Sequence, residues 1–209
     1  MLTRVKICGI TTWEDARLSI DLGASALGFN FYPSSPRAIS PADAWSIIRR
    51  LPPFVEVVGV FVNWPPLVVD ALARAVRLGS VQLHGAESPA EVAELCRKHR
   101  VIKAVRVKRG FRSASLGRYR AADAILLDGF APGLHGGTGR TLDWKLARAA
   151  RRYGRIILAG GLTPENIAEA VRVAQPYAVD VASGVEARPG RKDPARLRRL
   201  FEAIESAQG

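Results

Sequence analysis

Eight short apolar runs, each followed by a longer amphipathic segment, constrain the fold of this chain more than any other feature. The runs are residues 5–8, 26–31, 55–62, 81–84, 101–107, 124–128, 156–159 and 178–182. The segments between them carry apolar residues at three- and four-residue spacing, as at Leu197, Leu200, Phe201 and Ile204, and this spacing predicts helices. Strands that alternate with helices along a chain form a parallel sheet with the helices outside it.

Four dipeptides mark where helices are expected to begin. A capping side chain precedes a proline at Ser40-Pro41, Ser88-Pro89, Thr163-Pro164 and Asp193-Pro194. Proline suits the first helical turn, and the residue before it can cap the free N–H groups there. Ser88 is also followed three residues later by Glu91, which completes a capping box.

The spacing of these units fits a closed barrel. Divided among eight units, 209 residues leave about 26 residues each, enough for a strand, a helix and two tight loops. The chain is therefore predicted to be an α/β protein with a single (β/α)8 TIM barrel, one catalytic domain spanning residues 1–209. A doubly wound open sheet is the alternative, but it normally carries GxGxxG after the first strand, where this chain has Cys8-Gly9-Ile10-Thr11.

Composition limits the classes of protein to consider. The chain is 48% hydrophobic and 24% charged, and no run approaches the roughly 20 apolar residues of a membrane span. Its first residues lead into a strand rather than a signal-peptide core, so we expect a cytoplasmic protein without a membrane partner. Two cysteines and three histidines, with no HxH or HExxH spacing, predict no disulfide framework and no metal site.

The formal net charge of +12 leaves nucleic acid, a membrane surface and anionic small molecules open as partners. The basic residues are spread over several helix-like segments instead of forming one basic tail. No RNP or zinc-finger pattern interleaves aromatic residues among them. This distribution favours solvated helix faces, and we expect no nucleic-acid partner.

Polar side chains stand near the carboxyl ends of several predicted strands, the rim where barrel enzymes build their active sites. Cys8 closes the first strand, His84 the fourth and Asp128 the sixth, and Asp180 lies in the eighth. Cys8 also fits a small buried hydrophobe, and His84 a structural histidine. Asp128 ends an otherwise apolar strand, which favours a functional role. For Asp180, a buried pairing with Lys6 and a contact with substrate are both open.

Two glycine-bearing loops indicate a phosphate site. Gly160-Gly161 follows the seventh strand and Ser183-Gly184 follows the eighth. In barrel enzymes these loops commonly present backbone N–H groups and a short helix N-terminus to phosphate. We therefore expect a phosphorylated small molecule as ligand. A third loop, residues 136–139, is either a lid or a long turn.

The chain resembles the phosphoribosylanthranilate isomerase family of tryptophan biosynthesis. The resemblance covers nearly the whole chain through short stretches at residues 6–11, 35–37, 82–85, 127–128, 136–139, 143–144, 159–162 and 180–186. It implies the barrel fold, no metal and no organic cofactor. The implied reaction is the Amadori rearrangement of N-(5-phosphoribosyl)anthranilate to 1-(o-carboxyphenylamino)-1-deoxyribulose 5-phosphate, an aldose-ketose isomerisation.

The same resemblance implies roles for particular residues. Cys8 matches the general base of the family, Asp128 its general acid, and Arg37 the residue that faces the anthranilate carboxylate. His84 and Asp180 match positions that line the substrate pocket. The residues that match the phosphate-binding stretches are Gly160, Gly161, Ser183 and Gly184.

The chemistry requires both an acid and a base. Opening the furanose ring requires a proton on its ring oxygen, so Asp128 must be protonated, with a pKa above the ordinary value of about 3.9. Loss of the C2 proton from the resulting iminium requires a base. Cys8 must then be a thiolate, although a free thiol has a pKa of about 8.5. Lys6, on the same strand face, is the candidate positive neighbour. The iminium itself acidifies the C2 proton, so no metal or cofactor is required.

Other functions remain open from the sequence. One is another sugar-phosphate isomerase or epimerase on a barrel, although a metal-dependent epimerase needs more histidines than this chain has, and the histidine-pathway isomerase is expected to have Asp in place of Cys8. A basic nucleic-acid-binding protein and a noncatalytic sensor of a phosphorylated ligand belong to different classes. The sequence is compatible with a monomer or a homodimer.

Overall fold

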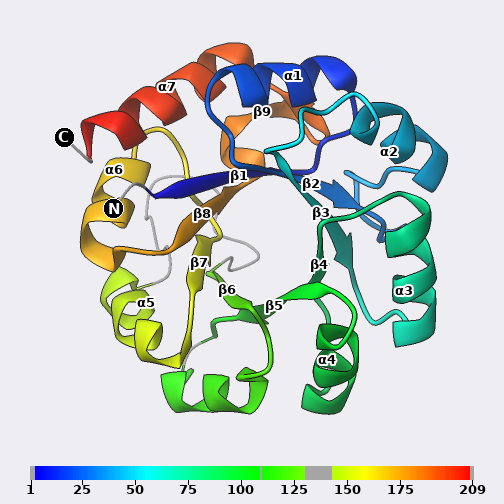
Figure 1. The fold of residues 1–209 in the computed structure, drawn as a ribbon. Helices are drawn as coiled ribbons and strands as arrows, with labels where there is room; N and C mark the ends of the chain where they lie inside the picture. Colours follow the sequence, from blue (N-terminus) through cyan, green and yellow to red (C-terminus); the bar gives the residue numbers. More distant parts are fainter. Residues whose placement is uncertain (1–2, 109, 130–142, 208–209) are drawn as a thin grey trace.

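The structure, a computed structural model, describes residues 3–108, 110–129 and 143–207. Eight parallel strands close into a barrel in the order β1 to β8, and helices surround them (Figure 1). The strands are β1 (Arg4–Cys8), β2 (Ala26–Asn30), β3 (Glu56–Phe61), β4 (Ser80–Leu83), β5 (Arg100–Arg106), β6 (Ala124–Asp128), β7 (Ile156–Ala159) and β8 (Ala178–Val181). The closed barrel confirms the predicted (β/α)8 fold and excludes the open sheet.

The strand bounds predicted from the apolar runs differ from the observed bounds by at most one residue. The agreement has a physical reason, because the strands are buried on both faces. Every residue of β4, β7 and β8 is buried, with helices outside the sheet and side chains filling the barrel. A continuous apolar run is therefore a direct signature of each strand.

The α-helices are α1 (Trp13–Asp21), α2 (Pro41–Ile48), α3 (Pro66–Ala75), α4 (Pro89–Cys96), α5 (Trp144–Ala150), α6 (Ile167–Ala174) and α7 (Pro194–Ser206). Between β5 and β6 the described residues form a 3-10 helix, η1 (Ser113–Tyr119), in place of an α-helix. This segment is short and contains Gly117, and both features disfavour an α-helix. A further 3-10 turn, η2 (Arg151–Tyr153), follows α5.

Three of the four predicted helix starts are confirmed. Ser40, Ser88 and Asp193 accept hydrogen bonds from backbone N–H groups of the first turn, and the capping box at Ser88 is present. The start predicted at Thr163-Pro164 is wrong, because α6 begins at Ile167. Asn166 Oδ1 accepts from the Thr163 N–H at 2.9 Å, which holds residues 163–166 in a turn before the helix.

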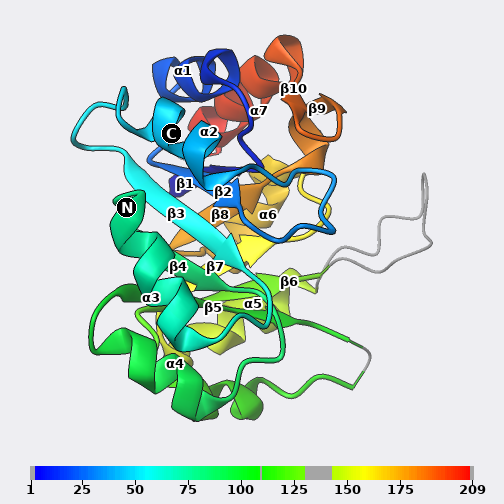
Figure 2. The ribbon, with the colours of Figure 1, turned by 90° about the vertical axis from the view of Figure 1, so that its right-hand side faces the viewer.

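The core has two layers. The larger lies between the sheet and the helices, and a smaller one fills the barrel with Val58, Ile102, Ala104, Ala124, Leu126, Ile157, Ala159 and Ala178. Figure 2 shows the barrel from the side, with the strands running towards its right-hand end. After β8 the chain forms η3 (Ser183–Val185) and a hairpin of β9 (Glu186–Arg188) and β10 (Arg191–Lys192) near that end. None of the helices in the described ranges has the length and apolarity needed to span a membrane.

Candidate active site

One cavity at the carboxyl ends of the strands, with a volume of about 310 Å³, brings the predicted site residues together. Its lining includes all nine of them: Cys8, Arg37, His84, Asp128, Gly160, Gly161, Asp180, Ser183 and Gly184. Cys8 ends β1 and Asp128 ends β6, so the thiol and the carboxyl group reach the cavity from strands separated by two others. The predicted loop at residues 136–139 lies outside the described residues.

Cys8 is a free, partly buried cysteine at the cavity wall. Burial raises the pKa of its thiol; the positive charges of Lys6 and Lys192 oppose this rise, and the carboxylate of Asp180 adds to it. Without substrate, Cys8 is therefore a neutral thiol at pH 7. Lys6 does lower this pKa, as expected of the predicted positive neighbour, but in this state burial has the larger effect.

The charge of Lys6 is shared with Asp180. Lys6 Nζ lies 2.8 Å from Asp180 Oδ1, and the two side chains are only 3% and 9% exposed. Burial lowers the pKa of Lys6, but the charge and hydrogen bond of Asp180 oppose this, and the net effect is a raised pKa, so the ammonium group stays charged. The predicted pairing with Lys6 is therefore confirmed, and Asp180 also lines the cavity, where the contact with substrate stays a prediction.

Gly28 has no side chain, and this leaves room for the side chains of Cys8 and Lys6. It pairs with Cys8 across β1 and β2. A Cβ atom on Gly28 would lie 2.8 Å from Cys8 Sγ and 2.9 Å from Lys6 Nζ, closer than real Cβ contacts. Gly28 was not among the predicted site residues, although a glycine inside a strand is a known signal of close approach.

Arg37 is held by Glu186. Its Nε donates to Glu186 Oε1 at 2.8 Å and its Nη2 donates to Oε2 at 2.6 Å. One edge of the guanidinium is thus bonded to the protein, and the Nη1 end is the part left to meet a ligand carboxylate. Burial raises the pKa of Glu186, but the hydrogen bonds from Arg37 and the charge of Lys192 hold it below its ordinary value. Glu186 is therefore ionised.

Lys192 connects the Arg37–Glu186 ion pair to β1, the strand that carries Cys8. Its Nζ lies 3.0 Å from Glu186 Oε1 and donates to the Cys8 carbonyl oxygen at 2.6 Å. The side chain is fully buried, and this burial lowers the pKa of Lys192 despite its pairing with Glu186. Lys192 was not predicted as a site residue, because residues 188–193 have the composition of a solvated charged loop.

His84 contacts Asp128 across the cavity. His84 Nε2 lies 3.2 Å from Asp128 Oδ2, and His84 Nδ1 lies 3.0 Å from Gln82 Nε2. Asp128 and His84 are only 17% and 22% exposed. The histidine thus has specific polar partners, one of which is the predicted general acid.

The loops after β7 and β8 form the other end of the cavity. A Cβ atom on Gly184 would collide with the carbonyl oxygen of Leu162, so only glycine lets the two loops pack this closely. The N–H groups of Gly161 and Gly184 donate to no residue in the described ranges. Two adjacent loops with free N–H groups form a concave site suited to an anion.

The chain is similar to known proteins of one family. Residues 5–203 match the family model of N-(5'phosphoribosyl)anthranilate (PRA) isomerase. The chain is 54% identical over 200 residues to an N-(5'-phosphoribosyl)anthranilate isomerase of Citrifermentans bemidjiense, an alignment that covers 96% of each chain.

Solved structures show the same similarity. The crystal structure of phosphoribosyl anthranilate isomerase from Thermotoga maritima is 46% identical with a TM-score of 0.91, covering 98% of this chain and 100% of that one. A phosphoribosyl anthranilate isomerase in complex with reduced 1-(o-carboxyphenylamino)-1-deoxyribulose 5-phosphate is 44% identical, with the same coverage and a TM-score of 0.88. Monomers generated from the dimeric Thermotoga maritima enzyme are 42% identical with a TM-score of 0.85, again covering 98% and 100%.

Proposed function

Because the chain belongs to the N-(5'-phosphoribosyl)anthranilate isomerase family, we propose that its barrel, as one catalytic domain at residues 1–209, catalyses the Amadori rearrangement of N-(5'-phosphoribosyl)anthranilate. The product is 1-(o-carboxyphenylamino)-1-deoxyribulose 5-phosphate. The observation that carries the proposal is that a thiol, a carboxyl group, an arginine and two glycine loops line the same cavity. A relative of 44% identity holds the reduced form of this product.

The two anionic ends of the substrate fix its orientation. The free N–H groups of Gly161 and Gly184 bind the phosphate, with Gly160 and Ser183 completing the loops. Arg37, held by Glu186, turns its Nη1 end towards the anthranilate carboxylate. The sugar then spans the cavity between Cys8 and Asp128, the two side chains that exchange protons with it.

Asp128 acts as the general acid. It gives its proton to the ring oxygen as the C1–O bond breaks, and the lone pair of the anthranilate nitrogen forms the C1–N iminium. Cys8 then removes the proton on C2, and the released electrons form a C1–C2 double bond while the iminium becomes an amine. The positive iminium favours the thiolate form of Cys8, which offsets the effect of burial. The enolamine gains a proton on C1 and loses the proton of O2 to become the ketose.

Complementation tests the proposed reaction in a cell. A tryptophan auxotroph that lacks this isomerase is expected to grow without tryptophan when it expresses the chain. Expression of the Asp128→Asn variant at the same level is the matched control and should not restore growth. Growth with neither protein, at equal expression, would overturn the proposed reaction.

Replacing Arg37 by alanine is expected to raise KM about 10- to 100-fold, because one charge-assisted contact with the carboxylate is lost. The effect on kcat should be smaller, since Arg37 takes part in no proton transfer. Glu186→Gln should raise KM in the same direction by a smaller factor, because Arg37 remains but is held less firmly. Steady-state kinetics measures both. Unchanged KM and kcat in the Arg37 variant would remove it from the site.

We also propose that the enzyme works in the cytoplasm on a small phosphorylated substrate, without nucleic acid. A reducing compartment suits an essential free thiol, and Cys8 and Cys96 are both free. Several arginines lie over aromatic rings, such as Arg50 over Trp13 at 3.8 Å and Arg4 over Tyr177 at 4.7 Å. Part of the positive charge therefore contributes to local packing.

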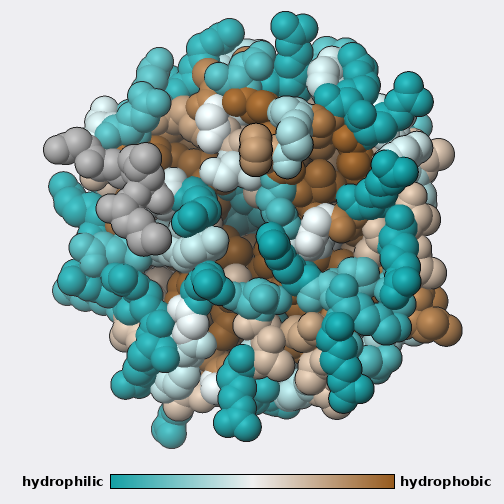
Figure 3. All heavy atoms as spheres, in the orientation of Figure 1, coloured by the Kyte–Doolittle hydropathy of each residue, from teal (hydrophilic) through white to brown (hydrophobic). Residues whose placement is uncertain are grey.

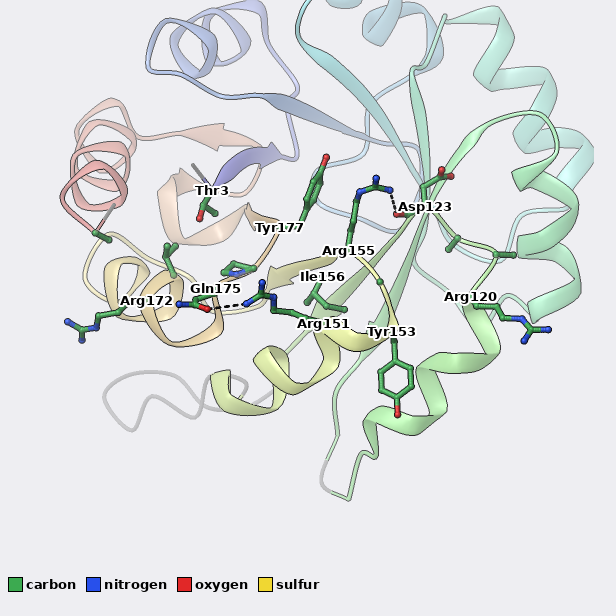
Figure 4. Close-up of a pocket in the computed structure, with 16 residues that line it drawn as sticks. Thr3, Arg120, Asp123, Arg151, Tyr153, Arg155, Ile156, Arg172, Gln175 and Tyr177 are labelled. Carbon is green, nitrogen blue, oxygen red and sulfur yellow. Dashed lines mark hydrogen bonds between the residues drawn. The ribbon is translucent and has the colours of Figure 1, made fainter. Parts of the chain in front are cut away.

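The amino ends of the strands carry features of a dimer interface. Phe54, in the loop before β3, is 97% exposed, and Figure 2 shows this loop projecting from the end of the barrel away from the candidate active site. In the space-filling view of this end, hydrophobic atoms are exposed among the hydrophilic side chains (Figure 3). A cavity of about 1090 Å³ opens at the same end, where Figure 4 shows Arg151, Arg155 and Tyr177 in its lining. We propose a homodimer, since the Thermotoga maritima relative is dimeric, and we place its interface at this face because of these features.

The mass of the protein in solution tests the dimer. The wild type is expected at about twice 22.6 kDa by light scattering coupled to gel filtration. Phe54→Arg should shift it to the monomer mass, because the added positive charge would face the arginines that line the cavity at the same end of the other subunit. Leu67→Arg, at a residue on α3 that is 75% exposed, is the control and should remain dimeric. A monomeric wild type would contradict the proposal.

A further inference from the structure

Gln82 is a fully buried amide on β4 that the reaction does not use directly. Its side chain makes one hydrogen bond among the described residues, between Nε2 and His84 Nδ1 at 3.0 Å. Its Oε1 is buried without a partner in the same part of the chain. Buried amides usually satisfy more of their hydrogen-bonding groups, so an amide with this single contact is unusual.

The contact determines which nitrogen of His84 carries the proton. An amide nitrogen can only donate, so His84 Nδ1 must accept. In a neutral imidazole whose Nδ1 accepts, the proton is on Nε2. That nitrogen lies 3.2 Å from Asp128 Oδ2, so its N–H is directed at the carboxyl group of Asp128.

The backbone on both sides of His84 is fixed. The buried ammonium of Lys103 donates to the carbonyl oxygens of Leu83 and Gly85, at 3.2 and 2.9 Å, and pairs with Glu87 at 2.8 Å. The N–H of His84 itself donates to the carbonyl oxygen of Phe61 at 2.8 Å. The backbone that carries the imidazole is therefore held in place. Gln82 then determines which ring nitrogen of His84 carries the proton.

We propose that Gln82 is a positioning residue: its amide holds His84 in the tautomer with the proton on Nε2, and this N–H stabilises the Asp128 carboxylate that forms when Asp128 protonates the substrate. The inference rests on the proposed function for the role of Asp128 as the acid. As the proton leaves Asp128 for the ring oxygen, negative charge develops next to a donor that is already in place. A fixed donor of this kind acts on the transition state and hence on kcat.

Proton-detected ¹⁵N NMR of the imidazole nitrogens tests the tautomer without measuring activity. The chain has three histidines, and the signals of His84 are those missing from His84→Asn. In the substrate-free wild type at neutral pH, we expect the proton on Nε2. Gln82→Met, which keeps the volume but neither donates nor accepts, should give a mixture of tautomers. Gln82→Glu, which can only accept, should move the proton to Nδ1 or protonate both nitrogens. A wild-type proton on Nδ1 would overturn the inference.

Kinetics tests the consequence. Gln82→Met is expected to lower kcat about tenfold and to change KM less than twofold, the effect of weakening one hydrogen bond to a charge in the transition state. In the His84→Ala background the same change should have no further effect on kcat, because Gln82 acts through His84. Ser80→Ala, which removes the hydrogen bond from Ser80 on β4 to Glu56, is the matched control and should keep the wild-type kcat. Equal losses in both backgrounds would show a merely structural role and contradict the inference.

The two measurements separate this inference from the proposed function. If Asp128→Asn keeps full activity while His84 carries its proton on Nε2, the assignment of the acid is wrong and the tautomer assignment stands. If Asp128→Asn is inactive but the tautomer is unchanged in Gln82→Met, the role of Gln82 is wrong. The wild-type spectrum remains decisive even if a Gln82 variant does not fold.

Discussion

Replacing Cys8 by alanine is expected to lower kcat by about 10² to 10⁴-fold, the range that general base catalysis contributes. The rest of the cavity does not offer a second thiol, because Cys96 lies on α4 outside the lining. Cys96→Ala is therefore the matched control and should keep the wild-type kcat. Both variants should show the circular dichroism spectrum of the folded barrel. Near-wild-type turnover in Cys8→Ala would remove Cys8 as the base.

The pH dependence of the wild type follows from the same residue. The base must be deprotonated, and burial raises the pKa of the Cys8 thiol in the free enzyme. The thiolate fraction therefore increases with pH up to and beyond the ordinary thiol range near 8.5, whereas Asp128 must keep its proton, so kcat/KM should rise with pH to a maximum and then fall. A profile with no range of pH over which kcat/KM rises would contradict a thiolate base.

Asp128→Asn is the second change with a large expected effect, again about 10² to 10⁴-fold on kcat. Asparagine has nearly the same shape as aspartate and keeps a hydrogen-bonding group beside His84, but it has no carboxylic proton to give to the ring oxygen. Asp193→Asn is the matched acid-to-amide control. It should be fully active, because asparagine caps α7 about as well as aspartate.

Binding separates a chemical effect of Asp128→Asn from a structural one. The variant is expected to bind the reduced product with an affinity within a few-fold of the wild type, because the phosphate loops and Arg37 are unchanged. Isothermal titration measures this affinity. Full turnover in the variant would refute the role of Asp128, and a loss of both turnover and binding would show that Asp128 shapes the cavity instead.

Most of the fold could be predicted from the sequence because its strands are buried on both faces. Apolar runs such as Ile156–Ala159, repeated eight times with helical segments between them, are typical of a parallel barrel. Local capping chemistry predicted three of the four helix starts correctly. It was wrong at Thr163, where the side chain of Asn166 stabilises a turn that competes with the helix. The replacement of an α-helix by η1 follows from a short segment that contains Gly117, which the periodicity of apolar residues does not report.

Apart from Arg37, which was predicted from the family resemblance, the predicted site residues lie at strand ends or in glycine loops. Cys8, His84 and Asp128 are polar residues in positions that packing alone would make apolar. Glu186 and Lys192 carry no such signal, because their importance comes from a hairpin that folds back over β1. Lys192 bonds the Cys8 carbonyl oxygen across 184 residues of sequence. Neither contact follows from residue spacing.

The protonation state of Cys8 could not be predicted from the sequence for a different reason. Lys6 does lie on the same face of β1 and contributes the expected positive charge. The degree of burial of the thiol and the pairing of Lys6 with Asp180 depend on the closed barrel, and they decide the sign of the shift. A charge count along one strand cannot include either effect.

The rate at which the purified wild type consumes freshly generated N-(5'-phosphoribosyl)anthranilate tests the central claim most directly. The loss of anthranilate fluorescence is expected to be first order in enzyme, and mass spectrometry should show a product of the same mass as the substrate. Fluorescence that decays at the same rate with and without the enzyme would contradict the proposed isomerase activity.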